Sequence, residues 1–208
     1  MLYLANPCGA DVIASMRAGQ LGYIDTPAQG NKRPDGVAWA ADNGCFGKGY
    51  PGDDEWFAWL QANAHDAVTC LFAVAPDVVA DAAATLERSL PWLPRIRSLG
   101  YPAALVAQDG LEDLEVPWDE FDVLFIGGST EWKLGPYARL VIHEAKRRGK
   151  WVHMGRVNSE KRYRYAHALG CDSADGTYLV FGPDINLPKL KAWLRTADQG
   201  VLDLGEVS

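Results

Sequence analysis

The sequence predicts a compact, TIM-like (β/α)8 barrel built as a single domain over residues 1–208. Three observations predict it. Eight short apolar segments with strand character recur along the chain, and helix-forming segments lie between most of them. Polar residues directly follow several strand segments, which is where barrel and open-sheet α/β enzymes carry their chemistry. The chain is short for a barrel, and a doubly wound open sheet is the second possibility.

The strands are predicted from brief apolar runs bordered by Gly, Pro, Asn or Asp. They are expected at residues 2–6, 21–24, 37–41, 68–74, 103–107, 123–126, 151–154 and 172–175.

The helices are predicted from apolar residues at helical spacing. They are expected at residues 10–18, 55–64, 79–99, 137–148, 159–169 and 187–194. Pro91 and Pro94 interrupt the third helix, where Ser89 is expected to cap a second segment. Loops 26–36 and 47–54 are rich in Gly, Pro and charge, and are therefore candidate lids or substrate loops.

The composition is that of a globular protein, with 48% hydrophobic residues and a formal net charge of −7. This charge argues against non-specific coating of nucleic acid, although it allows a local basic groove. No membrane span or secretion signal is expected, so a cytoplasmic location is predicted. The four cysteines and four histidines are scattered without metal-ligand spacing, which predicts free thiols and no metal.

Several familiar motifs are missing. The segment 44–49 faintly suggests a phosphate loop, but no Ser or Thr follows Lys48. No G-x-G-x-x-G opens a helix after the first predicted strand, and no G-x-S-x-G elbow is present. Nucleoside triphosphatases, dinucleotide enzymes and hydrolases with a serine triad are therefore disfavoured.

Carboxylates at strand ends are the chemistry that remains. Asp42, Asp77 and Asp175 each follow a small apolar run, and Gln108 ends another. Two aspartates facing one pocket can divide the work of glycosyl transfer between a nucleophile and a general acid or base. An Asx-turn or a helix cap is the structural alternative for Asp42 and Asp175, each of which is followed closely by glycine.

Five segments, in order, resemble one family. They are Asp42-Asn43-Gly44-Cys45-Phe46, Leu105-Val106-Ala107-Gln108-Asp109-Gly110, Phe125-Ile126-Gly127-Gly128, His153-Met154-Gly155-Arg156-Val157 and residues 168–175. They are similar to the motifs of the tRNA-guanine transglycosylases, or queuine tRNA-ribosyltransferases, which exchange guanine for a 7-deazaguanine base. The resemblance spans about residues 37 to 180.

The resemblance implies a role for each matching residue. Asp175 matches the nucleophile that attacks C1′ of the sugar, and Asp42 the acid/base residue. Asp77 matches the aspartate that reads the guanine edge. Gln108 and the Gly127–Gly128 backbone match groups around the base carbonyl, and Phe46 and Met154 the two faces of the ring. No cofactor is implied.

The chain lacks the closely spaced cysteines and histidine of the family's zinc subdomain. It is therefore most similar to small, zinc-less phage relatives that insert bases such as 7-cyano-7-deazaguanine into DNA, which implies the host cytoplasm as the location if the protein is phage-encoded. A homodimer is possible by analogy with the tRNA enzymes. Basic residues expected at the nucleic-acid backbone are Lys32, Arg33, Arg156, Lys161, Arg162 and Arg164.

Three alternatives stay open at this stage. The same exchange on tRNA is supported by the motifs and opposed by the missing zinc segment. A non-catalytic protein that binds a deazaguanine would need the pocket but not the nucleophile. A hydrolase that releases the base without replacing it would leave an abasic product.

Overall fold

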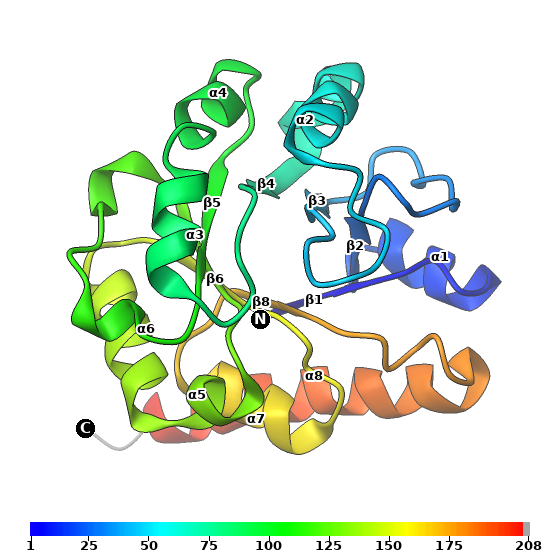
Figure 1. Ribbon diagram of the computed structural model, residues 1–208. Coiled ribbons are helices and arrows are strands. Elements are labelled where there is room, and N and C mark those ends of the chain that lie inside the picture. Colours follow the sequence, from blue (N-terminus) through cyan, green and yellow to red (C-terminus); the bar gives the residue numbers. More distant parts are fainter. Residues whose placement is uncertain (206–208) are drawn as a thin grey trace.

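The chain folds into a closed parallel β-barrel surrounded by helices (Figure 1). The computed structural model describes the backbone of residues 1–205 and the side chains of residues 1–196. Within these residues eight strands follow one another around the barrel in chain order, and β8 pairs with β1 to close it. Their bounds are β1 Leu2–Ala5, β2 Gly22–Asp25, β3 Trp39–Ala41, β4 Cys70–Val74, β5 Ala103–Ala107, β6 Val123–Ile126, β7 Trp151–Met154 and β8 Ser173–Asp175. The predicted barrel is confirmed, and closure excludes the open sheet.

Helices cover the outside of the strands. They are α1 Ala10–Arg17, α2 Asp53–Ala62, α3 Ala82–Ser89, α4 Leu93–Ser98, α5 Thr130–Leu134, α6 Pro136–Arg147, α7 Glu160–Ala168 and α8 Pro183–Gly205. The long α8 lies beside α7 and contacts α1 (Figure 1). No α-helix lies between β2 and β3 or between β5 and β6. None of the helices in the described part of the chain has the length and apolar character needed to cross a membrane.

The helices differ from those predicted at three places. The helix α5 was not predicted, and α8 begins at Pro183, earlier than expected. Ser89 does not cap a second segment: it ends α3, and its hydroxyl donates to the carbonyl of Pro76 at 2.7 Å. The second segment, α4, begins after Trp92 with Pro94 in its first turn, where a proline is tolerated because that N–H has no helical partner.

The core has two layers because successive side chains of a strand point to opposite faces. On β5, Ala104 and Val106 point into the barrel, and Leu105 packs outward against the helices. The inner layer is small, and consists of Leu4, Ile24, Ala40, Phe72, Val74, Ala104, Val106 and Val123 with four partly buried neighbours. The outer layer holds most of the buried aromatic rings. This alternation decides which residues at the strand ends reach the barrel mouth.

Candidate active site

The candidate site is the top layer of the barrel interior. Side chains that point inward recur every second residue, so the residue two positions after the last inner side chain also faces the barrel axis. On four strands this position holds a predicted site residue. The pairs are Ala40 and Asp42, Val106 and Gln108, Phe125 and Gly127, and Ser173 and Asp175.

These residues line one cleft at the carboxyl ends of the strands, with a volume of about 410 Å³. Nine predicted site residues meet there, although they span more than half of the chain. They are Asp42, Phe46, Asp77, Gln108, Gly127, Gly128, Arg156, Arg162 and Asp175. A cleft of this size falls in the range used for small-molecule ligands.

The charge of one carboxyl group in the cleft affects the titration of another. The pKa of Asp42 is raised to about 7, chiefly by burial and then by the negative charges of Asp175 and Asp77. Asp175 lines the same cleft at the end of β8, with its side chain 18% exposed. Asp42 is therefore suited to take up and release a proton near neutral pH beside a second carboxyl group.

Asp77 and Gln108 form the centre of a hydrogen-bond network. The Asp77 carboxylate accepts from Asn43 Nδ2 at 2.8 Å and from Gln108 Nε2 at 2.6 Å. Gln108 Oε1 in turn accepts from the backbone N–H groups of Ala80 and Gly128, each at 2.9 Å. The Gln108 amide and the Gly128 N–H thus bind each other in this structure, which ties the loops after β4, β5 and β6 together. Burial raises the pKa of Asp77.

Glycine is required where the β6 loop passes Gln108. A Cβ on Gly127 would lie 2.6 Å from the Val106 side chain, and Gly128 has a φ of +62°. Both features disfavour any larger residue at this turn. Gly127 and Gly128 therefore allow the backbone after β6 to approach the side-chain amide of Gln108 closely.

Phe46 and Arg156 form part of the rim. Phe46 is 66% exposed, and the Arg156 guanidinium carbon lies 4.5 Å above its ring centroid. The guanidinium also donates to the carbonyls of Gly127 and Gly128. Arg156 has a left-handed φ of +60°, an uncommon conformation for a non-glycine residue that is found at functional sites.

Met154 does not lie with the other predicted residues. It is 1% exposed in the outer layer, between the barrel and the helices, and does not line the cleft. Its neighbour His153 points into the barrel instead, because adjacent residues of β7 face opposite sides. The expected sandwich of a base between Phe46 and Met154 does not fit this geometry.

Two of the predicted backbone-contacting residues on α7 also lie outside the cleft lining. Lys161 is exposed, and Arg164 pairs with Glu160 one turn earlier at 2.8 Å. Arg162 lies on the cleft side of the same helix and donates to the Arg156 carbonyl.

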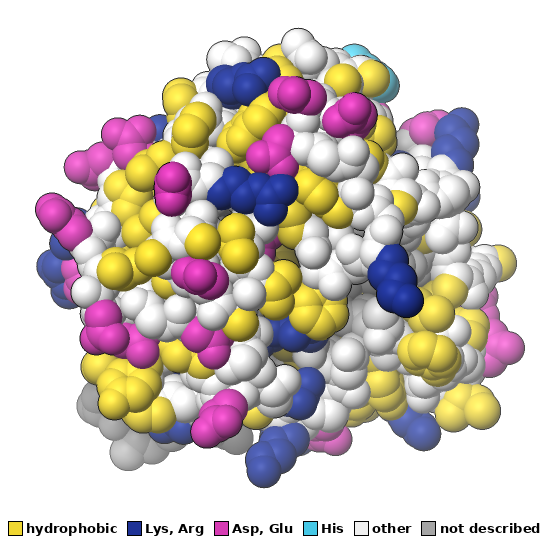
Figure 2. Space-filling view, viewed as in Figure 1, with side chains coloured by type: hydrophobic (Ala, Val, Ile, Leu, Met, Phe, Trp, Pro, Cys, Tyr) yellow, Lys and Arg dark blue, Asp and Glu magenta, His cyan; other side chains and the backbone are white. Residues whose placement is uncertain are grey.

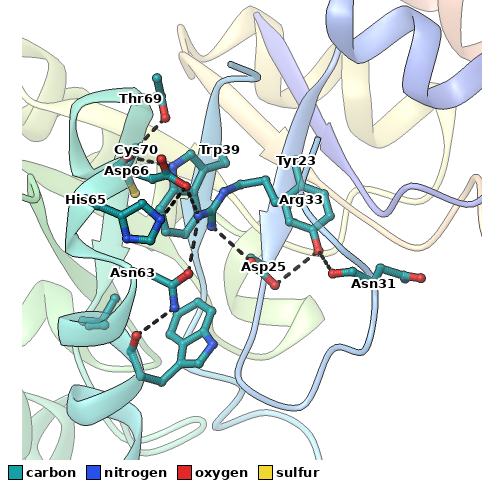
Figure 3. Close-up of polar contacts among 12 residues, drawn as sticks. Tyr23, Asp25, Asn31, Arg33, Trp39, Asn63, His65, Asp66, Thr69 and Cys70 are labelled. Atoms are coloured by element: carbon teal, nitrogen blue, oxygen red, sulfur yellow. Dashed lines mark hydrogen bonds and ion pairs between the residues drawn. The ribbon is translucent and has the colours of Figure 1, made fainter. Parts of the chain in front are cut away.

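Lys32 and Arg33 line a separate pocket between the β2–β3 loop and residues 59–69. Figure 3 shows Arg33 among its polar partners. The Arg33 guanidinium stacks 3.6 Å from the Trp39 ring centroid and pairs with Asp25 at 3.2 Å and Asp66 at 2.6 Å. This loop occupies the outer wall where a helix would otherwise pack. The guanidinium group of Arg33 therefore binds residues that fix the β2–β3 loop. The predicted contact of Arg33 with nucleic acid does not fit this position.

Replacing Arg33 with methionine should destabilise the fold. Methionine keeps apolar contact with Trp39 but leaves the carboxylate of Asp25, 8% exposed, without its cation. We expect the free energy of unfolding in urea to fall by about 3 kcal/mol. Lys32→Met, an exposed change in the same loop, is the control and should change stability by less than about 0.5 kcal/mol. Equal stability of Arg33→Met and the wild type would contradict this account.

Two residues beside the cleft were not predicted from the sequence. His153 is completely buried in the barrel interior, with Nε2 3.0 Å from Asp175 Oδ1. Lys133 of α5 is 4% exposed, and its ammonium group donates to the Gly155 carbonyl at 2.6 Å. Burial and the charge of Arg156 lower the Lys133 pKa to about 7. Strand alternation was a signal for His153, whereas nothing in the short α5 segment marked Lys133.

The cysteines are free thiols, as predicted, and Cys70 and Cys171 are buried. Among the described residues, no group of His, Cys, Asp and Glu is placed to hold a metal ion.

Comparison with known proteins supports the fold. No family model and no curated protein matches the chain. Among solved structures, the BexX/CysO complex of Amycolatopsis orientalis is similar with a TM-score of 0.57 and 18% identity, covering 99% of this chain and 91% of that one. An M. tuberculosis tryptophan synthase (TM-score 0.48, 13% identity, 92% and 66% covered) and the Bacillus subtilis YkuI protein with an EAL domain (0.49, 11%, 85% and 45%) also align. The first of these similarities shows a shared barrel fold, and none of them assigns a reaction.

Proposed function

We propose that this protein exchanges guanine in DNA for a 7-deazaguanine base, such as 7-cyano-7-deazaguanine, by double displacement. The observation that carries the proposal is the pairing of Asp42 and Asp175 in one cleft, where the charge of Asp175 helps raise the pKa of Asp42 to about 7. The motif resemblance names guanine as the base, and this pairing supplies the two carboxylates that such an exchange needs.

In the first step Asp175 Oδ2 attacks C1′ of the nucleotide. The C1′–N9 bond breaks, its electron pair goes to N9, and the proton of Asp42 neutralises the departing guanine. In the second step the incoming base gives its N9 proton to the Asp42 carboxylate, N9 attacks C1′, and the Oδ2–C1′ bond breaks. Two inversions leave the configuration at C1′ unchanged.

The walls of the cleft suit a flat heterocycle. Val74, Val79, Val106 and Phe125 provide apolar surface, and Asp77 brings a carboxylate to one edge. Asn43, Gln108 and the Cys45 thiol each use an acceptor position of Asp77, which leaves one for an N–H group of a base. A guanine must leave the DNA stack to reach this depth, which costs a few kcal/mol.

Two arginines at the cleft support a nucleic-acid substrate. Arg156 and Arg162 line the cleft, and within the described residues neither forms a salt bridge with a carboxylate. On the face drawn in Figure 2, Lys or Arg side chains lie at and below a central hollow. We call Arg156 and Arg162 the cationic rim, and assign it to the phosphates next to the target nucleotide.

The direct test is base exchange. The protein is incubated with guanine-containing DNA and 7-cyano-7-deazaguanine, the DNA is digested, and the nucleosides are separated by mass. The exchanged deoxynucleoside is the expected product. A parallel incubation with tRNA distinguishes the alternative substrate, and abasic DNA would reveal a hydrolase. Tight binding of the base without exchange on either nucleic acid would favour a non-catalytic binder and would overturn the proposal.

Replacing Arg162 with glutamine should weaken DNA binding without changing the fold. One phosphate contact is lost, so the slope of log K against log salt should fall by about 1. Fluorescence anisotropy of labelled DNA across a salt series measures it. Arg164→Gln is the matched control, because Arg164 lies on the same helix, pairs with Glu160 and is outside the cleft. An unchanged salt slope in Arg162→Gln would remove Arg162 from the interface.

A further inference from the structure

A line of hydrogen bonds runs through the barrel interior to Asp175. Trp151 Nε1 donates to Ser173 Oγ at 2.9 Å, Ser173 Oγ lies 2.8 Å from His153 Nδ1, and His153 Nε2 lies 3.0 Å from Asp175 Oδ1. Trp151 and His153 are alternate residues of β7, and Ser173 and Asp175 are alternate residues of β8, so all four point inward. His153 and Ser173 are register partners of β7 and β8, and this pairing places their side chains next to each other.

The groups at the two ends of this series of hydrogen bonds determine which atoms donate and which accept. An indole N–H can only donate, and an ionised carboxylate can only accept. His153 Nε2 must therefore carry a proton toward Asp175. If the Ser173 hydroxyl donates to a bare Nδ1, every polar atom of the line has a partner. The rings of Phe72 and Phe125 flank the imidazole, with centroids 5.0 Å and 4.5 Å away. They leave the imidazole little room to turn.

We infer that Trp151, Ser173 and His153 are positioning residues that hold Oδ1 of Asp175 and leave Oδ2 free to face the cleft. Among the described residues, Asp175 receives no side-chain hydrogen bond other than that of His153. The inference deepens the proposed function and rests on it for its kinetic consequence. When Oδ2 is bonded to C1′, Oδ1 is the carbonyl oxygen of the ester. The Nε2–H then stabilises the negative charge that returns to the carboxylate as this ester breaks.

The arrangement itself is tested without any substrate. Nitrogen NMR of the imidazoles distinguishes protonated from bare ring nitrogens, and the spectrum of His153→Gln identifies the His153 signals. We expect a protonated Nε2 and a bare Nδ1 in the wild-type protein. In Ser173→Ala the proton should stay on Nε2, because Asp175 still accepts it, and only the Nδ1 signal should shift, because nothing then donates to Nδ1. A wild-type spectrum with the proton on Nδ1 and a bare Nε2 would overturn the inference, whatever reaction the protein catalyses.

The kinetic consequence is tested with two variants. Glutamine can place an N–H donor where Nε2 lies, whereas methionine cannot. We expect His153→Met to lower kcat by about 10- to 100-fold with little change in KM for the base, and His153→Gln to restore most of kcat. Equal losses in the two folded variants, or a wild-type kcat in His153→Met, would show that the histidine only fills space. Absence of exchange in the wild type would instead count against the proposed function, and the NMR result would still decide the arrangement.

Discussion

Asp175→Asn should abolish base exchange, with a rate at least about a thousandfold below that of the wild-type protein. The asparagine amide is isosteric with the carboxylate but is a far weaker nucleophile, so no ester to C1′ can form. DNA binding should survive, because the cationic rim is unchanged. The measurement is incorporation of labelled 7-deazaguanine base into DNA under single-turnover conditions.

A covalent adduct provides the second readout for Asp175. Wild-type protein mixed with DNA in the absence of an entering base should yield a protein–DNA species that withstands denaturation, and Asp175→Asn should yield none. Asp184→Asn, an exposed change near the start of α8, is the control and should behave as the wild type. If Asp175→Asn still exchanged bases or formed the adduct, the nucleophile would have to be another residue.

Asp42→Asn should slow exchange and at the same time stabilise the protein. Loss of the general acid removes the proton for the departing guanine, which we expect to cost about 10²- to 10⁴-fold in rate. In the wild type the rate of adduct formation should fall as the pH rises through about 7, where Asp42 loses its proton. In Asp42→Asn the residual rate should not follow this titration.

The stability effect follows from the raised pKa of Asp42. A carboxyl group that holds its proton more tightly in the folded protein contributes stability that is complete below its unfolded pKa and is lost as the pH rises through about 7. Full burial would make this loss roughly 4 kcal/mol, and because Asp42 is half-buried we expect about 2 kcal/mol. Urea unfolding at pH 4 and pH 8 tests it. Asp42→Asn should be the more stable protein at pH 8, and identical pH dependence in both proteins would refute the assignment.

The barrel was predictable because each strand is short, apolar and bordered by turn residues. The predicted strand at 123–126 coincides with β6, and that at 103–107 with β5. The position of Asp42 and Asp175 was predictable too, since the carboxyl ends of parallel strands meet at one end of a barrel. Local sequence patterns therefore indicate whether a strand residue faces the barrel interior or the surrounding helices.

The predicted residues that lie away from the cleft were misplaced for different physical reasons. Met154 was assigned from its motif, but the alternation of β7 turns it outward and brings His153 inward. Arg33 was assigned from its charge, yet its partner Asp66 lies 33 residues away in the chain. The five residues of α5 are too few to show a helical period.

Acidic residues inside the cleft and basic residues at its mouth together create an electric field along the barrel axis. Asp77 and Asp175 sit inside, where Asp42 adds negative charge only once it loses its proton, and Arg156 and Arg162 stand at the entrance. A polyanion approaching this mouth is drawn to the entrance and repelled from the floor, so its uncharged base is the part that enters first. Orientation of the incoming strand would thus be set before any contact with the base, and it would weaken as ionic strength rises.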